Sequence, residues 1–221
     1  MKIKGLIFDM DGTMFDTEKI SLAAMEHLAK EYGIRLSRET MLSFMGLPGE
    51  KIRQRYLELF GADFDYAGYR QQKIDYQDAV IQREGVPVKA GLLPLLQYAG
   101  AKGIPCAVAT STNRERAEDL IHRAGVRDYF DAVVCGEDVV CGKPAPDIFL
   151  FAARKLGVSP ADCMGIEDSR NGILAVHRAG MFAALVPDLI PVDSEMAQAA
   201  DLQRDSLSEV LSFLKTGENG I

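Results

Sequence analysis

The sequence predicts an α/β protein built on an open, doubly wound parallel sheet, with an all-helical unit inserted into it. Short apolar runs alternate with helical patterns along most of the chain, which is typical of parallel strands joined by helical crossovers. A long stretch between the first two apolar runs carries helical patterns only. The 221 residues are enough for one ordinary domain and a small one.

Five short apolar runs have the length and composition of strands that are buried on both faces of a sheet. Between most of them lie helical patterns that end at a glycine, a residue that commonly terminates helices. The expected strands are residues 5–8, 105–109, 132–134, 163–166 and 181–186. The expected helices between them are residues 92–102, 113–124, 146–156 and 171–179. This order of elements predicts right-handed crossovers along one sheet.

The stretch from residue 18 to residue 84 has no convincing strand and is too long to be a crossover. Apolar residues at helical spacing begin at Ile20, and Gly33 ends this first pattern. Further helices are expected from Ser37 to about Gly46 and over residues 51–60 and 64–83. We therefore predict that residues 1–17 and 85–221 form the α/β core and that residues 18–84 form a helical cap domain.

The composition limits the partners that the protein can have. Hydrophobic residues make up 48% of the chain and charged residues 26%, which is ordinary for a globular protein. The formal net charge is −7, so we expect neither nucleic acid nor a membrane surface as a partner, because both need a basic face. No segment approaches 18 apolar residues, and the N-terminus has no signal-peptide pattern. A cytoplasmic location is expected, and a monomer is favoured.

Polar and charged side chains follow four of the predicted strands, at or shortly after the point where each strand ends. In chain order they are Asp9, Asp11, Thr110, Ser111, Lys143, Glu167 and Asp168. In an open α/β sheet, ligands bind beyond the carboxyl ends of the strands. We therefore expect these side chains to converge on one rim of the sheet.

The chemistry of this set points to a metal and a phosphate. Four carboxylates close together would resist ionisation unless a cation lay among them. Hard oxygen ligands with open positions suit Mg²⁺, which binds substrate phosphate while keeping some of its waters. Lys143 and backbone N–H groups would hold other phosphate oxygens, and Gly12 would let the backbone approach them closely. One carboxylate could then attack phosphorus and another could move protons, which predicts phosphoryl transfer.

Each motif alone also has an ordinary structural explanation. Asp-x-Asp-Gly can open a calcium loop, but the sixth and twelfth positions here are Met and Ile where such a loop needs Gly and Glu. Thr110 and the pair Glu167-Asp168 could serve as helix caps, and an isolated Lys143 would usually be a solvated surface lysine. The occurrence of all four motifs at successive strand ends favours a functional site.

These motifs, in this order, resemble those of the haloacid dehalogenase (HAD) superfamily over nearly the whole chain. Segment 9–13 resembles the first motif, Thr110 the second, Lys143-Pro144 the third and segment 165–169 the fourth. Segment 142–149 is similar to the branch that contains beta-phosphoglucomutase and sugar-phosphate phosphatases. The resemblance implies a Rossmann-like core, a bound Mg²⁺ ion and a helical cap inserted between the first and second motifs.

The resemblance also implies a catalytic role for two aspartates. Asp9 would be the nucleophile and a metal ligand. Asp11 would protonate the leaving alcohol and then deprotonate the water that hydrolyses the aspartyl-phosphate, and its backbone carbonyl would bind the metal. Dehalogenases of the superfamily lack this second aspartate, so Asp11 favours phosphoryl transfer.

The remaining motif residues would bind the substrate phosphate and the metal. By the same resemblance, Thr110, the backbone of Ser111 and Lys143 would bind phosphate. Asp168 would be a metal ligand, and Glu167 would be either a fourth ligand or a residue that supports the ligands.

Two departures from the mutase pattern favour a hydrolase. Ser21 stands in the place of a histidine that closely follows the first motif in beta-phosphoglucomutase, and segment 46–50 lacks the mutase arginine that grips a second phosphate. We expect a phosphomonoesterase that acts on a small sugar or nucleoside phosphate. The alternatives are a sugar phosphomutase and a non-catalytic phosphometabolite-binding protein, and Asp11 argues against the latter.

Substrate choice is expected to depend on cap residues that face the rim, because pockets form preferentially where domains meet. The candidate side chains are Lys51, Arg53, Arg55, Arg70 and Lys73. The histidines lie on helical patterns away from the strand ends, and we interpret them as surface or boundary residues rather than ligands: His27, His122 and His177.

Overall fold

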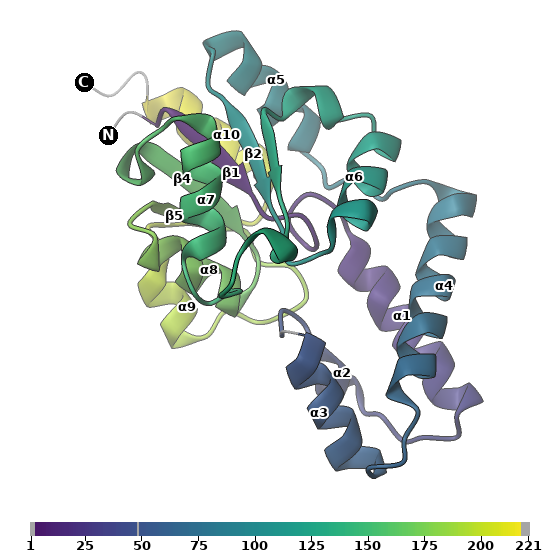
Figure 1. The fold of residues 1–221 in the computed structure, drawn as a ribbon. Helices are drawn as coiled ribbons and strands as arrows, with labels where there is room; N and C mark the ends of the chain where they lie inside the picture. The colour runs from purple at the N-terminus through teal and green to yellow at the C-terminus, as the bar shows by residue number, and fades with distance from the viewer. Residues whose placement is uncertain (1–2, 48, 218–221) are drawn as a thin grey trace.

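The computed structural model of the chain describes residues 3–47 and 49–217. Its centre is a sheet of six parallel strands in the order β3-β2-β1-β4-β5-β6 (Figure 1). The strands are β1 (Gly5–Phe8), β2 (Cys106–Ala109), β3 (Ala132–Val134), β4 (Cys163–Glu167), β5 (Phe182–Leu185) and β6 (Leu202–Gln203). The strand order runs outward from β1 in both directions, so the sheet is doubly wound, as the sequence predicts.

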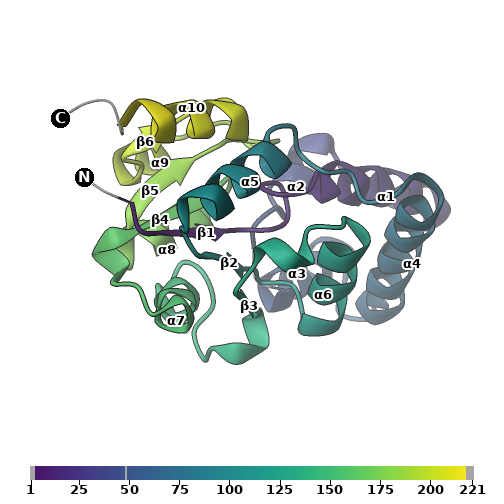
Figure 2. The ribbon, with the colours of Figure 1, turned by 90° about the horizontal axis from the view of Figure 1, so that it is seen from above.

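Helices cover both faces of the sheet, and the strand side chains alternate between the two faces. Leu6 and Phe8 pack on one face with α5 (Leu92–Lys102), α6 (Arg114–Arg123) and α10 (Leu207–Gly217). Ile7 packs on the other face with α7 (Asp147–Leu156), α8 (Arg170–Arg178) and α9 (Ser194–Ala199). Figure 2 shows α5 and α10 above the strands and α7 below them. Burial on both faces explains why the strands appear in the sequence as continuous apolar runs.

Four helices that lie between β1 and α5 in the sequence form a separate layer: α1 (Thr17–Glu31), α2 (Arg38–Leu42), α3 (Gly49–Phe60) and α4 (Tyr66–Glu84). In Figure 1, α1 and α4 run side by side, away from the sheet. Tyr56 is buried at the centre of an aromatic cluster, with its ring centre 4.9 Å from that of Tyr69 and 5.0 Å from that of Phe44. This layer therefore has a hydrophobic core of its own, and the predicted α/β fold with an inserted helical cap is confirmed.

The two chain segments that join the cap to the core lie side by side. Phe15 forms an antiparallel bridge with Val88. The ammonium of Lys89 lies 2.8 Å from the carboxylate of Asp16 and 2.6 Å from that of Asp188. Helix α1 begins and α4 ends beside this connection; the domain boundaries at residues 18 and 84 stay a prediction.

Three elements near the C-terminal end are absent from the sequence-based prediction: α9, β6 and α10. β6 has two residues and α9 has six, so neither is long enough to show a clear periodic pattern. Short 3₁₀ turns occur at Arg127–Tyr129, Gly136–Asp138 and Pro160–Asp162. No helix within residues 3–47 and 49–217 has both the length and the apolar composition needed to cross a bilayer. Pro48, in the segment that lacks the mutase arginine, lies outside the described residues.

Candidate active site

The carboxyl ends of β1 and β4 bring three acids together. The two strands are neighbours in the sheet, with Phe8 paired to Ile166, so Asp9 follows one strand beside the end of the other. One carboxylate oxygen from each of Asp9, Glu167 and Asp168 lies within 4.8 Å of the others, and all three residues are buried. Hard oxygen donors at this spacing fit a divalent cation such as Mg²⁺.

Burial dominates the ionisation of these acids. Loss of contact with water raises the pKa of Asp9 and of Asp168 well above the usual value, and the negative charge of Glu167 raises both pKa values further. Lys143 opposes the shift at Asp9, and a hydrogen bond from Thr13 opposes it at Asp168. A divalent cation among the acids would favour their ionised forms. The cluster therefore needs additional positive charge to be fully ionised.

Lys143 supplies part of that charge. Its ammonium donates to Oδ1 of Asp9, to Oε1 of Glu167 (2.7 Å) and to the carbonyl oxygen of Ala109 (3.0 Å). Burial lowers the pKa of Lys143, but the Asp9 and Glu167 carboxylates outweigh this effect and hold the pKa above its ordinary value. The lysine thus stays charged beside the carboxylate that is predicted to be the nucleophile.

Glu167 organises the loop that follows β4. Its Oε2 accepts hydrogen bonds from the backbone N–H groups of Asp168 and Ser169, each at 2.9 Å, and from the Ser169 hydroxyl at 3.0 Å. A β-carbon added at Gly172 would overlap the Glu167 carboxylate, which explains the glycine at this place in α8. Both carboxylate oxygens of Glu167 already have donors, so this residue fixes Lys143 and the loop. Its role as a direct metal ligand stays a prediction.

Gly12 makes room for the carboxylate of Asp168, the acid that is predicted to bind the metal. Its φ is +88°, and a β-carbon there would overlap the carboxylate of Asp168. The hydroxyl of the next residue, Thr13, donates to Oδ1 of Asp168 at 3.0 Å. The turn after β1 thus positions an acid that belongs to the loop after β4.

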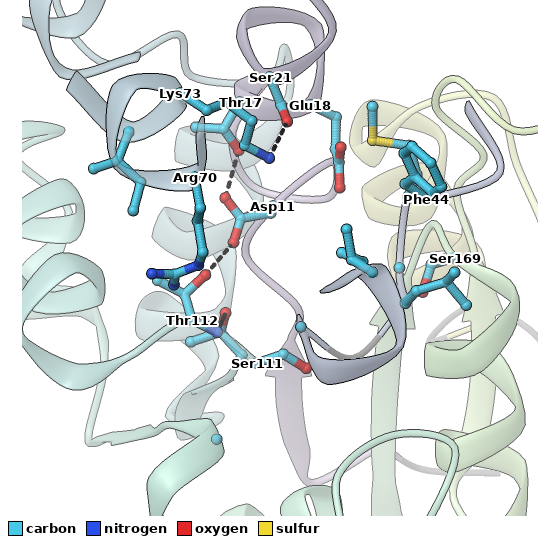
Figure 3. A pocket seen from close by; sticks show the side chains of 18 of the residues that line it. Asp11, Thr17, Glu18, Ser21, Phe44, Arg70, Lys73, Ser111, Thr112 and Ser169 are labelled. Atoms are coloured by element: carbon cyan, nitrogen blue, oxygen red, sulfur yellow. Dashed lines mark hydrogen bonds between the residues drawn. The ribbon is translucent and has the colours of Figure 1, made fainter. Parts of the chain in front are cut away.

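Two hydroxyl groups hold Asp11, and neither is assigned this role from the sequence. The Thr17 hydroxyl donates to Oδ1 of Asp11 at 2.6 Å, and the Thr112 hydroxyl donates to Oδ2 at 2.7 Å (Figure 3). Thr17 begins the cap helix α1, whereas Thr112 lies in the loop after β2, so these contacts join the cap to the core through Asp11. Hydroxyl residues at such positions are often helix caps, and the sequence therefore carries no distinct signal for this role.

The loop after β2 places its two candidate phosphate ligands differently. Thr110 is buried, and its hydroxyl oxygen accepts from the backbone N–H of Thr112 at 3.1 Å. Ser111 is exposed and lines the cavity described below. Asn113 then caps α6 by accepting from the backbone N–H of Arg116 at 2.9 Å. The phosphate-binding roles of Thr110 and Ser111 stay predictions.

A cavity of about 580 Å³ lies between this rim and the cap. Asp9, Asp11 and Lys143 line its core side. Its cap side is partly apolar and includes the aromatic residues Phe44, Tyr56, Tyr66 and Tyr69. The volume is in the range of small-molecule binding pockets, so the predicted reacting groups face a space that can hold a small metabolite.

Charged residues also line the cap side of the cavity. Lys73 and Arg70 on α4 do so, and Lys73 donates to the Ser21 hydroxyl at 3.1 Å (Figure 3). Glu18 on α1 and Arg116 on α6 are further lining residues that are absent from the sequence-based candidates. Burial raises the pKa of Glu18 to about 8, and burial lowers the pKa of Lys73. Both residues are partly buried, and loss of contact with water is the largest cause of each shift.

The other cap candidates lie away from the cavity. Lys51, Arg53 and Arg55 are exposed on α3 and are not among the described residues that line it. Arg53 instead donates to the Glu50 carboxylate at 2.7 and 2.9 Å. Helical spacing alone cannot show which face of α3 meets the core. The histidines are exposed on helices outside the cavity, as interpreted from the sequence: His27, His122 and His177.

Comparison with known proteins identifies the class. Residues 6–186 match the family model described as Haloacid dehalogenase-like hydrolase. The chain is 37% identical over 183 residues to the fructose-1-phosphate phosphatase YqaB of Escherichia coli (strain K12), and this match covers 81% of this chain and 94% of that protein. It is 32% identical over 216 residues to the beta-phosphoglucomutase of Bacillus subtilis (strain 168), covering 94% and 95%. The crystal structure of beta-phosphoglucomutase from Clostridium difficile superimposes with a TM-score of 0.81 at 26% identity, covering 98% and 97%.

The chain therefore belongs to the haloacid dehalogenase-like hydrolases. The resemblance inferred from the four motifs is confirmed, and so is the expectation of an enzyme of the HAD phosphatase class. Enzymes of this family generally use a divalent metal, and the buried acids Asp9, Glu167 and Asp168 offer a place for one.

Proposed function

We propose that the protein is a Mg²⁺-dependent phosphomonoesterase that hydrolyses a small sugar or nucleoside phosphate through an aspartyl-phosphate on Asp9. The observation that carries this proposal is the convergence of Asp9, Lys143 and Glu167 on the floor of a ligand-sized cavity, with Asp168 beside Asp9 and Glu167. A sugar phosphate is supported by the similarity to a fructose-1-phosphate phosphatase. The cavity volume suits a substrate of this size.

The proposed reaction has two steps. In the first, an oxygen of the Asp9 carboxylate bonds to phosphorus as the ester P–O bond breaks, and Asp11 gives a proton to the departing alcohol oxygen. In the second, Asp11 takes a proton from water, the water oxygen bonds to phosphorus, and the bond between Asp9 and phosphorus breaks. Inorganic phosphate leaves, and both aspartates return to their starting forms. Lys143, Thr110 and the backbone of Ser111 hold phosphate oxygens throughout.

Asp9, Asp168 and the backbone carbonyl of Asp11 would hold the metal, with Glu167 as a fourth ligand or as support. When bound, Mg²⁺ supplies positive charge that offsets the repulsion between these acids and the substrate phosphate. The donor set consists of hard oxygens, which is the chemistry that Mg²⁺ prefers.

Removal of divalent cations is expected to silence the enzyme. Without the ion, the acids at the floor of the cavity repel the substrate phosphate and each other. Release of p-nitrophenol from p-nitrophenyl phosphate should fall to background after treatment with EDTA and return when Mg²⁺ is added in excess. Full activity in EDTA would contradict the role given to the acid cluster.

Hydrolysis is proposed over phosphate transfer within a sugar, because Ser21 stands where the mutase pattern has a histidine. In the structure the Ser21 hydroxyl accepts from Lys73 on the cap side of the cavity. A panel of phosphorylated metabolites separates the two reactions when both free phosphate and isomeric products are measured. A phosphatase releases phosphate in proportion to substrate consumed, whereas a mutase returns an isomer and little phosphate.

A further inference from the structure

The two sides of the cavity differ in how their charges are balanced. On the core side, Lys143 is already bonded to Asp9 and Glu167. The charged residues that line the remaining wall are Glu18, Arg70, Lys73 and Arg116. This wall carries three cations and one acid. A phosphate held at Asp9 would be neutralised by groups on the core side of the cavity and not by this wall.

The three cations differ in their partners. Arg116 forms an ion pair with Asp78 of α4 at 2.5 Å. Lys73 donates to the neutral hydroxyl of Ser21. Arg70 has no hydrogen bond or ion pair with any residue in 3–47 or 49–217. With Arg116 balanced by Asp78, the formal charges of Arg70, Lys73 and Glu18 sum to +1, so the wall has excess positive charge.

Arg70 is also directed at the space where a substrate would lie. In Figure 3 its side chain reaches from α4 toward Thr112 in the loop after β2, and both residues line the cavity. The positive charges of Arg70 and Arg116 contribute to the lowered pKa of Lys73, although burial is the larger cause. An anion between these side chains would relieve that repulsion. A guanidinium suits this task, since its planar fork matches the oxygens of a carboxylate or a phosphate.

We propose that Arg70 binds a second anionic group of the substrate, a carboxylate or a second phosphate, at the end away from the phosphoryl group that is transferred. This inference rests on the proposed phosphatase function and specifies its substrate class as phosphate esters with an anionic tail. Glu18 lies on another cap helix of the cavity, α1, where its carboxyl group can hydrogen-bond to substrate hydroxyls and offers no positive charge to an anion. The tail therefore points to α4 rather than to α1.

Three esters with one carbon skeleton test the inference: glycerol 1-phosphate, 3-phosphoglycerate and glycerol 1,3-bisphosphate. Their tails are a hydroxyl, a carboxylate and a phosphate. Wild-type protein with Mg²⁺ should have a higher kcat/KM for at least one anionic tail than for the hydroxyl tail. Arg70→Gln should lower kcat/KM for that anionic ester by about 10- to 100-fold, as expected for lost hydrogen bonds between charged groups. It should change the value for glycerol 1-phosphate by less than about 3-fold.

The control is Arg83→Gln, which removes an exposed arginine near the end of the same helix, outside the residues that line the cavity. It should leave all three values unchanged. Whichever anionic ester loses more with Arg70→Gln identifies the tail as a carboxylate or a phosphate. Equal losses on all three esters, no loss on any, or a wild-type preference for the hydroxyl tail would overturn the inference.

The same assay separates this inference from the proposed function. Hydrolysis of p-nitrophenyl phosphate but of none of the three esters would overturn the inference of an anionic tail and would leave the proposed phosphatase function standing. Failure to release phosphate from any ester, including p-nitrophenyl phosphate and a metabolite panel, would overturn both.

Discussion

Replacing Asp9 by asparagine is expected to abolish phosphate release, with a loss in kcat of about 10⁴-fold or more. An amide cannot attack phosphorus as a carboxylate does. Among the described residues, the other carboxylate bonded to Lys143 is that of Glu167, and both of its oxygens already accept hydrogen bonds, so it cannot replace Asp9. The measurement is phosphate release from p-nitrophenyl phosphate and from the best metabolite of a panel. Wild-type turnover by this variant would mean that the nucleophile is misassigned.

The Asp9→Asn variant is expected to fold, because the substitution removes one of three mutually repelling buried acids and leaves Lys143 paired with Glu167. Thermal unfolding checks this directly. The matched control is Asp63→Asn, which changes an exposed aspartate outside the residues that line the cavity and should keep full activity. A loss of activity in Asp9→Asn without a loss of fold then reports on chemistry.

Replacing Asp11 by asparagine is expected to lower hydrolysis of a sugar phosphate by about 10² to 10⁴-fold, the range of general acid–base catalysis. The amide cannot give a proton to the departing alcohol or take one from water. Its carbonyl oxygen can still accept from one of the two hydroxyls, of Thr17 and Thr112, and its NH2 group can donate to the oxygen of the other, so the local structure should persist. Inorganic phosphate should still bind in the presence of Mg²⁺, as measured by calorimetry. A full rate in this variant would remove the proposed acid–base role.

The fold was predictable because each strand of the sheet's centre is buried on both faces. Leu6, Ile7 and Phe8 point alternately to the two helical layers, and each packs in a hydrophobic cluster with the helices on its side, so successive residues are all apolar. At the sheet edge this signal is lost, since Gln203 in β6 is exposed and the strand has two residues. The aromatic cluster around Tyr56 explains why the inserted segment shows helical patterns with apolar faces.

The site was predictable where the chain topology alone brings residues together. Asp9 and Asp168 meet because β1 and β4 are neighbours, and this follows from the order of motifs and the doubly wound sheet. The residues that line the cap side of the cavity could not be predicted from the sequence, because the orientation of α3 and α4 is set by packing between helices. That packing leaves Lys51 outside the cavity and places Arg70 in its wall.

The most direct test of the account is to look for the phosphoryl group on Asp9 itself. The Asp11→Asn variant can form the intermediate from p-nitrophenyl phosphate, because p-nitrophenolate leaves without needing a proton, but it lacks the base that hydrolyses the intermediate. Rapid mixing with Mg²⁺ should give a burst of one p-nitrophenolate per protein chain. Mass spectrometry after an acid quench should find one phosphoryl group, on the peptide that contains Asp9. Continued release with no phosphorylated peptide, or a phosphoryl group on a different residue, would contradict the account.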